Sequence, residues 1–413
     1  MIAELNVGIV GGSITGCCAA ILLERAGHRV TVFERSNTGL VGRGGGIGTI
    51  GSVLRSMIED DLVDADFPHT SISKLAFTAA SSRSDRMGVS PWQGPMDFQA
   101  FHWTALWNQL RKRVPDKSYL GGHEVTAVTA NGPDGAALRL ADGSEHAFDL
   151  VLFADGYQSL GRATLFPESE LSYRGYLLWR GLLRESDLEH SEPFEESIVR
   201  LSYLGGMPGD LVMYFIPNEN GSTKRGERIC NWAAYIQRSE ENLSDFMIDN
   251  RGRRRSGAIP PGRMSVESEN QMKELVASNL PAYYAAIIRA TQDTFVQLVY
   301  NNQLSHYAKD RVCVVGDAGI IVQPFTMSGV FKGWNNVQDL LKALRGWDTL
   351  EDALERWSSE QVRVGRRLLA LAAQMEDALI WNRLDFTKAD ARSTEAWWRA
   401  AVKWPEEIPL DQV

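Results

Sequence analysis

The stretch that decides the fold is VGIVGGSITG at residues 7–16, where a short apolar run ends in a glycine-rich turn. A helix is predicted at residues 17–27 and a second strand at 29–33, so the order along the chain is strand, turn, helix, strand. Gly11 suits a tight turn and Gly16 lets helix and strand approach closely, while the helix N-terminus faces a pyrophosphate. The stretch therefore predicts a dinucleotide-binding βαβ unit.

Glu34 follows the second strand at the distance that this fingerprint expects, and it can accept a hydrogen bond from an adenosine ribose hydroxyl. It also disfavours a 2′-phosphate, because two negative groups would be forced together. Ser13 stands where the usual G-x-G-x-x-G pattern has its middle glycine. The nucleotide is therefore FAD or NAD, and we expect it to contact Gly11, Gly12, Ser13, Ile14, Thr15 and Gly16.

The composition is that of an ordinary globular chain, with 413 residues of which 44% are hydrophobic and 23% charged. This length is too great for one average domain, so two closely joined domains are expected. The net charge of −9 argues against nucleic acid or an anionic membrane as the main partner, since either needs a basic face. The exception is a basic group that we interpret as a solvated loop rather than a phosphate site. Its members are Arg251, Arg253, Arg254 and Arg255.

The cysteines and the hydropathy pattern bear on the compartment. The 4 cysteines have neither C-x-x-C nor Cys/His spacing, which argues against a metal site and suits reduced thiols in the cytoplasm. The sequence shows no signal-peptide pattern and no apolar run of the ~18 residues that a membrane span needs. We therefore expect a cytoplasmic protein.

Two later apolar runs end on acidic residues. Residues 150–153 precede Asp155, and residues 312–315 precede Asp317. An aspartate at the end of a buried strand can offer its carboxylate to the ribityl hydroxyls of a flavin, where hydrogen bonding offsets its desolvation. Each run separately could also be a strand that simply ends in a turn.

The segments DLVLFADGYQSLGR at 149–162 and GDAGIIVQPFTMSG at 316–329 resemble the paired flavin signatures of class A FAD-dependent aromatic monooxygenases. In that family the first signature reads roughly D-x-x-x-x-A-D-G-x-x-S-x-x-R, and the second begins with G-D. The segments 173–181, 214–217 and 249–252, together with Trp232, are similar to those of the branch of 2,6-dihydroxypyridine 3-hydroxylase-like enzymes, and the similarity covers nearly the whole chain up to about residue 345. The resemblance implies FAD as cofactor, NADH or NADPH as reductant and O2 as co-substrate. It also implies hydroxylation of an electron-rich aromatic or heteroaromatic small molecule through a flavin C4a-hydroperoxide.

The resemblance also implies an α/β fold like that of para-hydroxybenzoate hydroxylase. Such a fold has a Rossmann-like FAD-binding domain, an inserted antiparallel β-sheet substrate domain and a C-terminal helical segment. We predict that the discontinuous FAD-binding domain covers residues 1–170 and 296–345. The substrate domain is predicted at residues 171–295 and the helical segment at 346–413.

The family pattern extends the predicted cofactor site beyond the glycine turn. Trp103 stands where many relatives carry an arginine, so the countercharge for the pyrophosphate is left unassigned, with Arg35 and Arg43 as candidates. Lys332 is either a flavin-site cation or, as we expect, a solvent-facing helix residue. The helix start at 329–331 can stabilise negative charge on the flavin. The further predicted contacts are Glu34, Arg35, Arg43, Val125, Asp155, Asp317, Pro324, Gly329, Val330 and Phe331, where Val125 is equally well read as an ordinary strand residue.

The substrate site is less evident from the sequence. A phenolic substrate becomes more nucleophilic on deprotonation, so a base or a cation near its hydroxyl would help. The candidates for this catalytic role are Tyr214, Arg180 and His69. The candidates for substrate contact are Tyr176, Tyr203 and Trp232, although for each of these aromatic residues we favour core or interface packing over substrate contact.

Other functions share the same flavin site. An epoxidase or other oxygenase acting on a natural-product scaffold remains open, as does a flavoprotein without net redox turnover. A flavin-dependent halogenase is disfavoured, because no W-x-W-x-I-P stretch precedes Ile216 and Pro217. A group of C-terminal tryptophans can serve packing or a homodimer contact. This group comprises Trp381, Trp397, Trp398 and Trp404.

Overall fold

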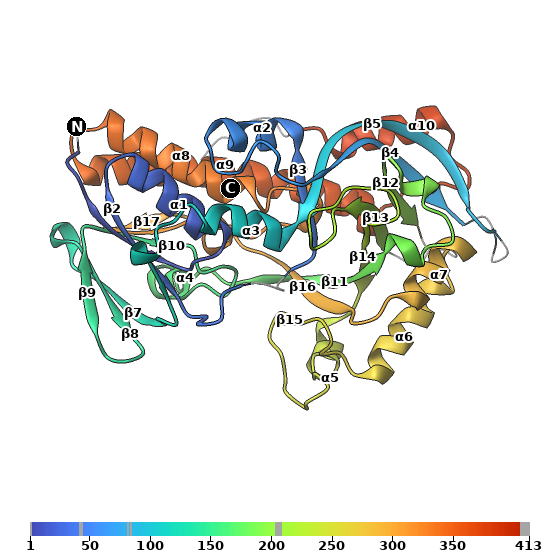
Figure 1. Ribbon diagram of the computed structural model, residues 1–413, viewed down its shortest axis with the longest axis horizontal. Helices are drawn as coiled ribbons and strands as arrows, with labels where there is room; N and C mark the ends of the chain where they lie inside the picture. Colours follow the sequence, from blue (N-terminus) through green and yellow to red (C-terminus); the bar gives the residue numbers. More distant parts are fainter. Residues whose placement is uncertain (1, 41–43, 81, 83–84, 203–208, 405–413) are drawn as a thin grey trace.

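The computed structural model describes residues 2–40, 44–80, 82, 85–202 and 209–404. Figure 1 shows an elongated molecule, with one sheet at the end that holds the N-terminus and a second sheet at the other end. The fold is the predicted mixed α/β architecture, with a Rossmann-like domain and a helical C-terminal segment.

The first sheet has six strands that come from segments far apart in the sequence, in the order β17–β18–β10–β1–β2–β6. The neighbours from β18 to β6 are parallel, and β17 is antiparallel to β18. The strand that precedes Asp155 therefore lies between the strand of the glycine turn and the strand that precedes Asp317. The strands are β1 (Asn6–Val10), β2 (Arg29–Glu34), β6 (Tyr119–Gly121), β10 (Leu150–Phe153), β17 (Ala308–Lys309) and β18 (Val312–Val314).

Helices and a small sheet enclose this first sheet. Helix α1 packs against both α3 and α8, and their buried residues form one core with the strands. The small sheet has the order β7–β8–β9. The elements are α1 (Ile14–Arg25), α3 (Trp103–Arg111), α8 (Phe331–Gly346), β7 (Val125–Ala130), β8 (Ala136–Leu140) and β9 (Glu145–Phe148).

The second sheet has nine strands in the order β15–β16–β11–β14–β13–β12–β4–β5–β3. Its pairs are antiparallel except for β12 with β4, which is parallel. The strands are β3 (Gly46–Ile50), β4 (Thr70–Ala79), β5 (Val89–His102), β11 (Ser172–Arg184), β12 (Ser197–Ser202), β13 (Asp210–Ile216), β14 (Ile229–Gln237), β15 (Ala258–Ile259) and β16 (Phe295–Asn301).

Alternation of side chains gives this nine-stranded sheet two different faces. One face is covered by α6 (Val266–Ala277) and α7 (Ala282–Ala290), which share a core with it. The opposite face packs against residues of α9 (Leu350–Glu376) and α10 (Ala391–Ala401) and against Phe325, which belongs to the second flavin motif. We call this opposite face the flavin face.

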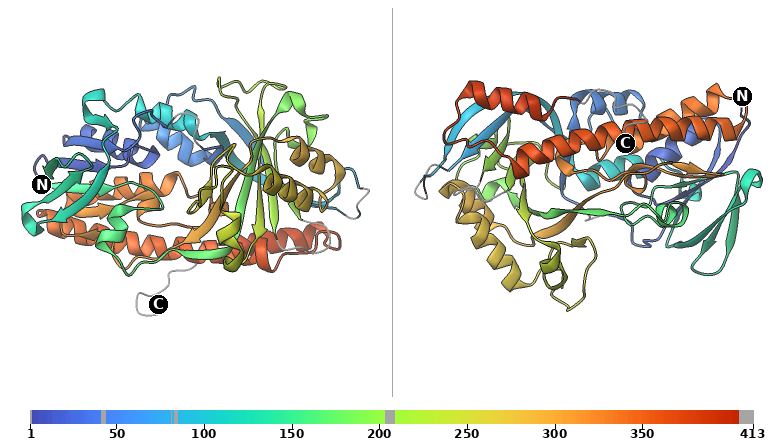
Figure 2. Two further views of the ribbon diagram at one scale, coloured as in Figure 1. Left: turned by 90° about the horizontal axis from the view of Figure 1, so that it is seen from below. Right: turned by 180° about the vertical axis from the view of Figure 1, so that it is seen from behind.

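The C-terminal helices connect the two ends of the molecule. Helix α9 has 27 residues, which corresponds to about 40 Å at 1.5 Å per residue. Leu354 and Trp357, near its start, lie in the core of the first sheet, whereas Leu371 and Met375 lie in the core of the flavin face. The right-hand view of Figure 2 shows α9 running along the length of the molecule.

Three strands of the nine-stranded sheet, β3, β4 and β5, come from residues 46–102. The sequence analysis assigned these residues to the FAD-binding segment 1–170. Strand β4 pairs with β12, and β5 and β3 follow beside β4 in the same sheet. Pairing between segments so far apart leaves no local pattern in the sequence. The division of the chain into domains stays a prediction, and the sheet places these three strands with the substrate-domain strands.

Two further observations concern the described residues only. Every helix in these ranges is too short or too polar to cross a lipid bilayer. The same ranges contain no group of three or more His, Cys, Asp or Glu side chains that could hold a metal ion.

Candidate flavin and substrate site

The glycine turn after β1 is a close approach of backbone to backbone. Gly11 has a φ of +102°, which L side chains rarely adopt. A Cβ on Gly16 would lie 1.8 Å from the carbonyl oxygen of Gly11, and one on Gly12 would lie 2.3 Å from the hydroxyl of Tyr119. Only glycine fits at these places, so the turn presents bare backbone to a ligand.

Helix α1 begins directly after this turn. Its first intrahelical bond in the turn runs from the Cys17 N–H to the Ser13 carbonyl at 2.9 Å. The N–H groups of Ile14, Thr15 and Gly16 precede that bond, so they are free of helical partners and point out of the helix start. Together with the positive end of the helix dipole they suit a pyrophosphate.

Glu34 is buried at the end of β2 and holds the neighbouring backbone. Its Oε2 accepts from the Gly12 N–H and its Oε1 from the Ser36 N–H, both at 2.9 Å. Each carboxylate oxygen can accept more than one hydrogen bond, so capacity remains for a ribose hydroxyl.

Asp155 caps a short helix, α4 (Leu160–Leu165), beside the site. Its Oδ2 accepts from the Leu160 N–H at 2.7 Å. Burial raises the pKa of Asp155, and hydrogen bonds from Ser159 and from the Leu160 amide oppose the shift. Its Oδ1 is buried without a partner among the described residues, so this oxygen is available to a ligand.

Arg162 joins the two acidic motifs. Its buried guanidinium donates to the carbonyls of Asp317 at 3.2 Å and Ala318 at 3.0 Å, and also to the carbonyl of Tyr157. Asp155 and Asp317 are the principal charges that act on it. The arginine at the end of the first signature therefore sets the distance between the two motifs.

Lys332 differs from the expectation that it faces solvent. Its side chain is 6% exposed, and its Nζ lies 2.5 Å from Asp317 Oδ1 and donates to the Ile320 carbonyl at 2.7 Å. Both acceptors belong to the second flavin motif, which directly precedes α8. Lys332 is thus a buried cation that pairs with the aspartate of the second motif.

Thr15, in the glycine turn, lies against Gly316 of the second flavin motif and against Gly333 in α8. A Cβ on Gly316 would lie 2.7 Å from Thr15 Oγ1, and one on Gly333 would lie 2.4 Å from it. The Gly316 N–H also donates to Asn336 Oδ1 at 2.8 Å. Asn336 was not among the predicted residues, because an asparagine inside a helix carries no motif of its own.

A polar group stands on the flavin face, around the backbone of Gly46. Arg180 donates to the Gly46 carbonyl and, at 3.3 Å, to Gln297 Oε1. The Tyr214 hydroxyl donates to the same carbonyl at 3.4 Å, and Asn231 Oδ1 accepts from the Gly46 N–H at 3.0 Å. We call Arg180, Tyr214 and Asn231 the polar wall.

The polar wall has unused hydrogen-bonding capacity. Arg180 Nε and Asn231 Nδ2 are buried without partners among the described residues. Burial lowers the pKa of the Arg180 guanidinium, whose named acceptors are neutral, and burial raises the pKa of Tyr214. The wall therefore presents a cation and amide and hydroxyl groups to a ligand.

A cavity of about 160 Å³ lies where the two halves of the molecule meet. Asp317 and Pro324 contribute from the second flavin motif, and Leu178 and Gln297 contribute from the nine-stranded sheet. The cavity is lined by Tyr157, Leu178, Gly257, Ala258, Gln297, Leu298, Val299, Tyr300, Asp317, Ile321, Val322 and Pro324.

Comparisons with known proteins agree with this geometry. Residues 9–44 match the NAD(P)-binding Rossmann-like domain, and residues 173–301 match the family described as FAD binding domain-like. The chain is 32% identical over 261 residues to the aurachin C monooxygenase/isomerase of Stigmatella aurantiaca, covering 59% of this chain and 67% of that protein. It is 24% identical over 376 residues to the 2,6-dihydroxypyridine 3-monooxygenase of Paenarthrobacter nicotinovorans, covering 91% of each.

The chain belongs to the class A FAD-dependent monooxygenases. The solved structure of 2,6-dihydroxypyridine-3-hydroxylase from Arthrobacter nicotinovorans matches this monooxygenase over 100% of both chains, with a TM-score of 0.83 and 22% identity. A second match is HpxO of Klebsiella pneumoniae, solved with FAD and uric acid, with a TM-score of 0.72 and 16% identity over 98% of this chain and 94% of that chain. Both likenesses concern the fold.

The residues of the monooxygenase fit FAD. The backbone turn and the start of α1 suit the pyrophosphate, and Glu34 suits the ribose. The half-exposed Asp317 carboxylate could accept hydrogen bonds from ribityl hydroxyls, and Asp155 Oδ1 is a further acceptor without a partner among the described residues. A Cβ on Gly329 would meet nothing within 4 Å, so the start of α8 leaves room for the flavin ring.

The remaining predicted cofactor residues lie as follows in the monooxygenase. Arg35 is exposed just after β2. Burial raises the pKa of Tyr157, and the charge of Arg35 opposes part of that shift. Val125 begins β7 and is partly buried, which agrees with either interpretation. Val330 and Phe331 stand at the start of α8 as expected. Arg43 lies outside the described residues.

The predicted substrate residues of the monooxygenase do not all come together. Trp232 is corrected, because it lies on the face covered by α6 and α7, where its Nε1 donates to Thr291 Oγ1 at 2.9 Å. In β14, Trp232 is next to Asn231, and adjacent strand residues point to opposite faces. Tyr176 lies on the flavin face but packs against Trp381, with ring centroids 6.0 Å apart. Tyr203 lies outside the described residues.

His69 precedes β4, and its Nδ1 lies 2.7 Å from the Phe67 carbonyl. This contact is local, and no described contact brings His69 to the polar wall. Asn231 belongs to the wall but was missed by the sequence analysis. The only available signal was strand alternation with its neighbour Trp232. Because Trp232 was predicted to face the substrate, alternation placed Asn231 on the wrong face.

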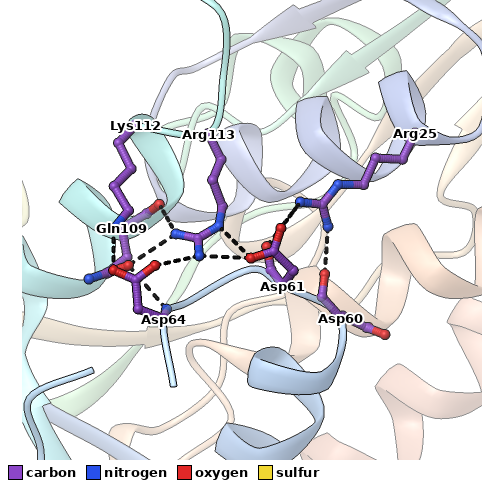
Figure 3. A network of polar contacts seen from close by, with 7 residues as sticks. All are labelled: Arg25, Asp60, Asp61, Asp64, Gln109, Lys112 and Arg113. Atoms are coloured by element: carbon purple, nitrogen blue, oxygen red, sulfur yellow. Dashed lines mark hydrogen bonds and ion pairs between the residues drawn. The ribbon is translucent and has the colours of Figure 1, made fainter. Parts of the chain in front are cut away.

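Salt bridges hold α1 in place behind the cofactor site of the monooxygenase. Figure 3 shows Arg25, at the end of α1, bonded to Asp61 at 2.7 Å, and Arg113 bonded to both Asp61 at 2.9 Å and Asp64 at 2.7 Å. Lys112 and Arg113 hold the pKa of Asp64 well below its usual range. The network ties α1 to the segment after α2 (Gly51–Glu59) and to the end of α3.

Proposed function

We propose that this monooxygenase hydroxylates an electron-rich aromatic or heteroaromatic small molecule, with NADH or NADPH as reductant. The observation that carries the proposal is the polar wall, whose Arg180 donates to Gln297, one of the residues that line the cavity together with Asp317 and Pro324. When bound, FAD supplies the oxidising power, because it takes electrons from NAD(P)H and uses O2 to deliver one oxygen atom.

Arg180 and Tyr214 are the proposed orienting residues. The named contacts of Arg180 are to neutral oxygens, so its charge favours an anionic phenolate over a neutral phenol. Deprotonation makes the ring more nucleophilic, and the Tyr214 hydroxyl can donate to the same substrate oxygen. Asn231 provides a further donor through Nδ2.

The apolar part of the cavity has a separate role in this proposal. Leu178, Val299, Ile321 and Val322 surround the position next to Asp317 and Pro324. Such walls exclude water, which would otherwise release the activated oxygen as peroxide. The chain therefore needs no metal cluster or nucleophile for this chemistry.

The test is oxygen incorporation. The purified enzyme with FAD is incubated with NADH or NADPH and a panel of phenols and hydroxypyridines under ¹⁸O2. The proposal expects an aromatic compound that stimulates coenzyme oxidation and gains one ¹⁸O atom. If no compound in the panel is oxygenated while coenzyme oxidation still proceeds to peroxide, the substrate class is wrong.

A second candidate is an oxygenase or epoxidase that acts on a natural-product scaffold. It is favoured by the 32% identity to a protein named aurachin C monooxygenase/isomerase. Product mass together with the position of the label separates ring hydroxylation from epoxidation. A flavoprotein without net turnover is the third candidate, and flavin reduction by NAD(P)H would exclude it.

We also propose a cytoplasmic enzyme and a homodimer. The four cysteines are free and buried, which suits a reducing compartment. Trp381 and Trp404 are 42% and 47% exposed, whereas Trp397 and Trp398 pack against Phe77. Mass determination in solution by light scattering tests the dimer.

A further inference from the structure

The arginine-rich segment at residues 249–257 is an organised loop. Asp249 Oδ1 accepts from the N–H groups of Arg251 at 2.9 Å and Arg253 at 3.0 Å, and its Oδ2 accepts from Arg255 Nε at 2.7 Å. These hydrogen bonds lower the pKa of Asp249 to about 2. The loop therefore has a defined shape around one buried carboxylate.

This arrangement leaves three guanidiniums for other partners. Asp249 pairs with Arg255, whereas Arg251, Arg253 and Arg254 are exposed. Among the described residues, no ion pair involves any of these three. In a chain with a net charge of −9, they form a local basic patch, which we call the arginine loop.

The arginine loop is attached to the flavin side of the molecule. The Tyr157 hydroxyl donates to the Ser256 carbonyl at 3.1 Å, and Gln158 Nε2 donates to Ser256 Oγ at 2.8 Å. Both donors follow Asp155 in the first flavin motif. The Leu298 N–H donates to the Gly257 carbonyl at 2.7 Å, which ties the loop to β16 as well.

The loop also stands at the edge of the cavity. Gly257 and Ala258, which directly follow it, line the cavity together with Tyr157 and Asp317. Arg254 is three residues before Gly257, a separation of at most about 10 Å along an extended chain. Figure 1 shows the segment from α5 (Leu243–Phe246) to β15 below β16 and beside α6. A ligand in the cavity can therefore extend an anionic part to the arginines.

We propose that the arginine loop binds the phosphates of NADH or NADPH, while the dihydronicotinamide enters the cavity. The inference rests on the proposed use of NAD(P)H by this enzyme. The single glycine fingerprint of the chain is needed for FAD, so the reductant requires another anion site. Guanidinium groups bind phosphates through paired N–H donors. The proposal gives a binding role to exposed arginines that the sequence alone led us to interpret as a solvated loop.

In this arrangement the nicotinamide and the arginines have separate tasks. The dihydronicotinamide gives up a hydride, which carries two electrons, to the flavin and leaves as the oxidised pyridinium. The arginines take no part in that step. They hold the phosphates, so their removal should change affinity and leave the rate of hydride transfer at saturation unchanged.

The experiment compares two triple variants of the FAD-loaded enzyme. The test variant carries Arg251→Gln, Arg253→Gln and Arg254→Gln. The control variant removes the same charge from exposed positions elsewhere, with Lys117→Gln, Lys309→Gln and Arg392→Gln. Anaerobic reduction of the flavin is followed against coenzyme concentration at low and high salt, and NADP⁺ binding is measured by calorimetry.

The proposal expects the test variant to bind NAD(P)H and NADP⁺ at least tenfold more weakly, with a smaller salt dependence. Its limiting reduction rate, FAD content and Tm should match the control. Reduction by 1-benzyl-1,4-dihydronicotinamide, which lacks phosphates, should be unchanged. Equal coenzyme affinity in both variants overturns the proposal, as does an equal loss with the phosphate-free reductant.

Failure of the proposed function gives a different result. In that case neither coenzyme reduces the wild-type flavin. Calorimetry with NADP⁺ still tests the loop, because binding that the test variant loses supports the site and absence of binding in the wild type overturns it.

Discussion

Arg162→Met is the sharpest test of how the flavin site is assembled. The guanidinium is buried and donates to three backbone carbonyls, those of Tyr157, Asp317 and Ala318. Methionine occupies a similar length but offers no donor. The substitution therefore leaves three carbonyls without partners where the two flavin motifs meet.

The expected cost follows from these contacts. An unsatisfied buried polar group costs about 1–3 kcal/mol. The cost is smaller than three times this value, because removing the guanidinium also removes the penalty of burying its charge. That same burial is the main cause of the lowered pKa of Arg162. We therefore expect a loss of about 2–4 kcal/mol in the free energy of unfolding. Since about 1.4 kcal/mol is a factor of ten, FAD affinity should fall roughly tenfold if half of this loss acts on the site.

The assay combines urea unfolding with FAD titration. Unfolding of the FAD-free protein gives the stability, and quenching of flavin fluorescence gives the Kd. Arg139→Met serves as control, because Arg139 is 62% exposed and pairs with Glu145 on the surface, where a pair is worth about 0–1 kcal/mol. Wild-type FAD affinity in the Arg162 variant would refute the claim that this residue couples the two motifs.

Three further predictions concern single residues. Gly16→Ala should yield protein without bound flavin, because its Cβ would lie 1.8 Å from a backbone oxygen, and the absorbance of the purified protein checks this. Trp232→Phe should cost about 1 kcal/mol of stability through its lost hydrogen bond and leave the KM for an aromatic substrate unchanged. Tyr214→Phe should instead lower kcat/KM at unchanged stability. A raised KM in the Trp232 variant would contradict its assignment to the face covered by α6 and α7. Burial holds the pKa of His102 below its ordinary 6.5, so the unfolded chain takes up the proton first as pH falls. Stability should therefore be complete above about pH 6.5 and decline below it, and urea unfolding from pH 7.5 to 5 should show a smaller decline for His102→Asn.

The glycine turn and the strand ends of the cofactor half were predictable from the sequence because their requirements are local. Gly11 and Gly16 are demanded by backbone contacts within one turn, and Glu34 by the end of the next strand. Asp155 and Asp317 stand directly after strands that the hydropathy pattern reveals. Such features lie within a few residues of each other, so the sequence displays them.

The errors have a common physical cause. Lys332 was expected in solvent, but its acceptors lie on Asp317 and Ile320, which precede it by more than ten residues. Trp232 was assigned to the substrate side, although strand alternation does not say which face of a sheet is covered by helices. In both cases the deciding partner comes from another part of the chain.

The sequence by itself determined the strand, turn and helix order, the family and the FAD cofactor, because these depend on short segments whose backbone geometry admits few residue types. Only the tertiary structure decided which residues share the flavin face, how Arg180, Tyr214 and Asn231 meet around Gly46, and where the arginine loop stands. These positions depend on pairing between distant strands and on which helix covers which face, and such long-range contacts leave no periodic trace along the chain.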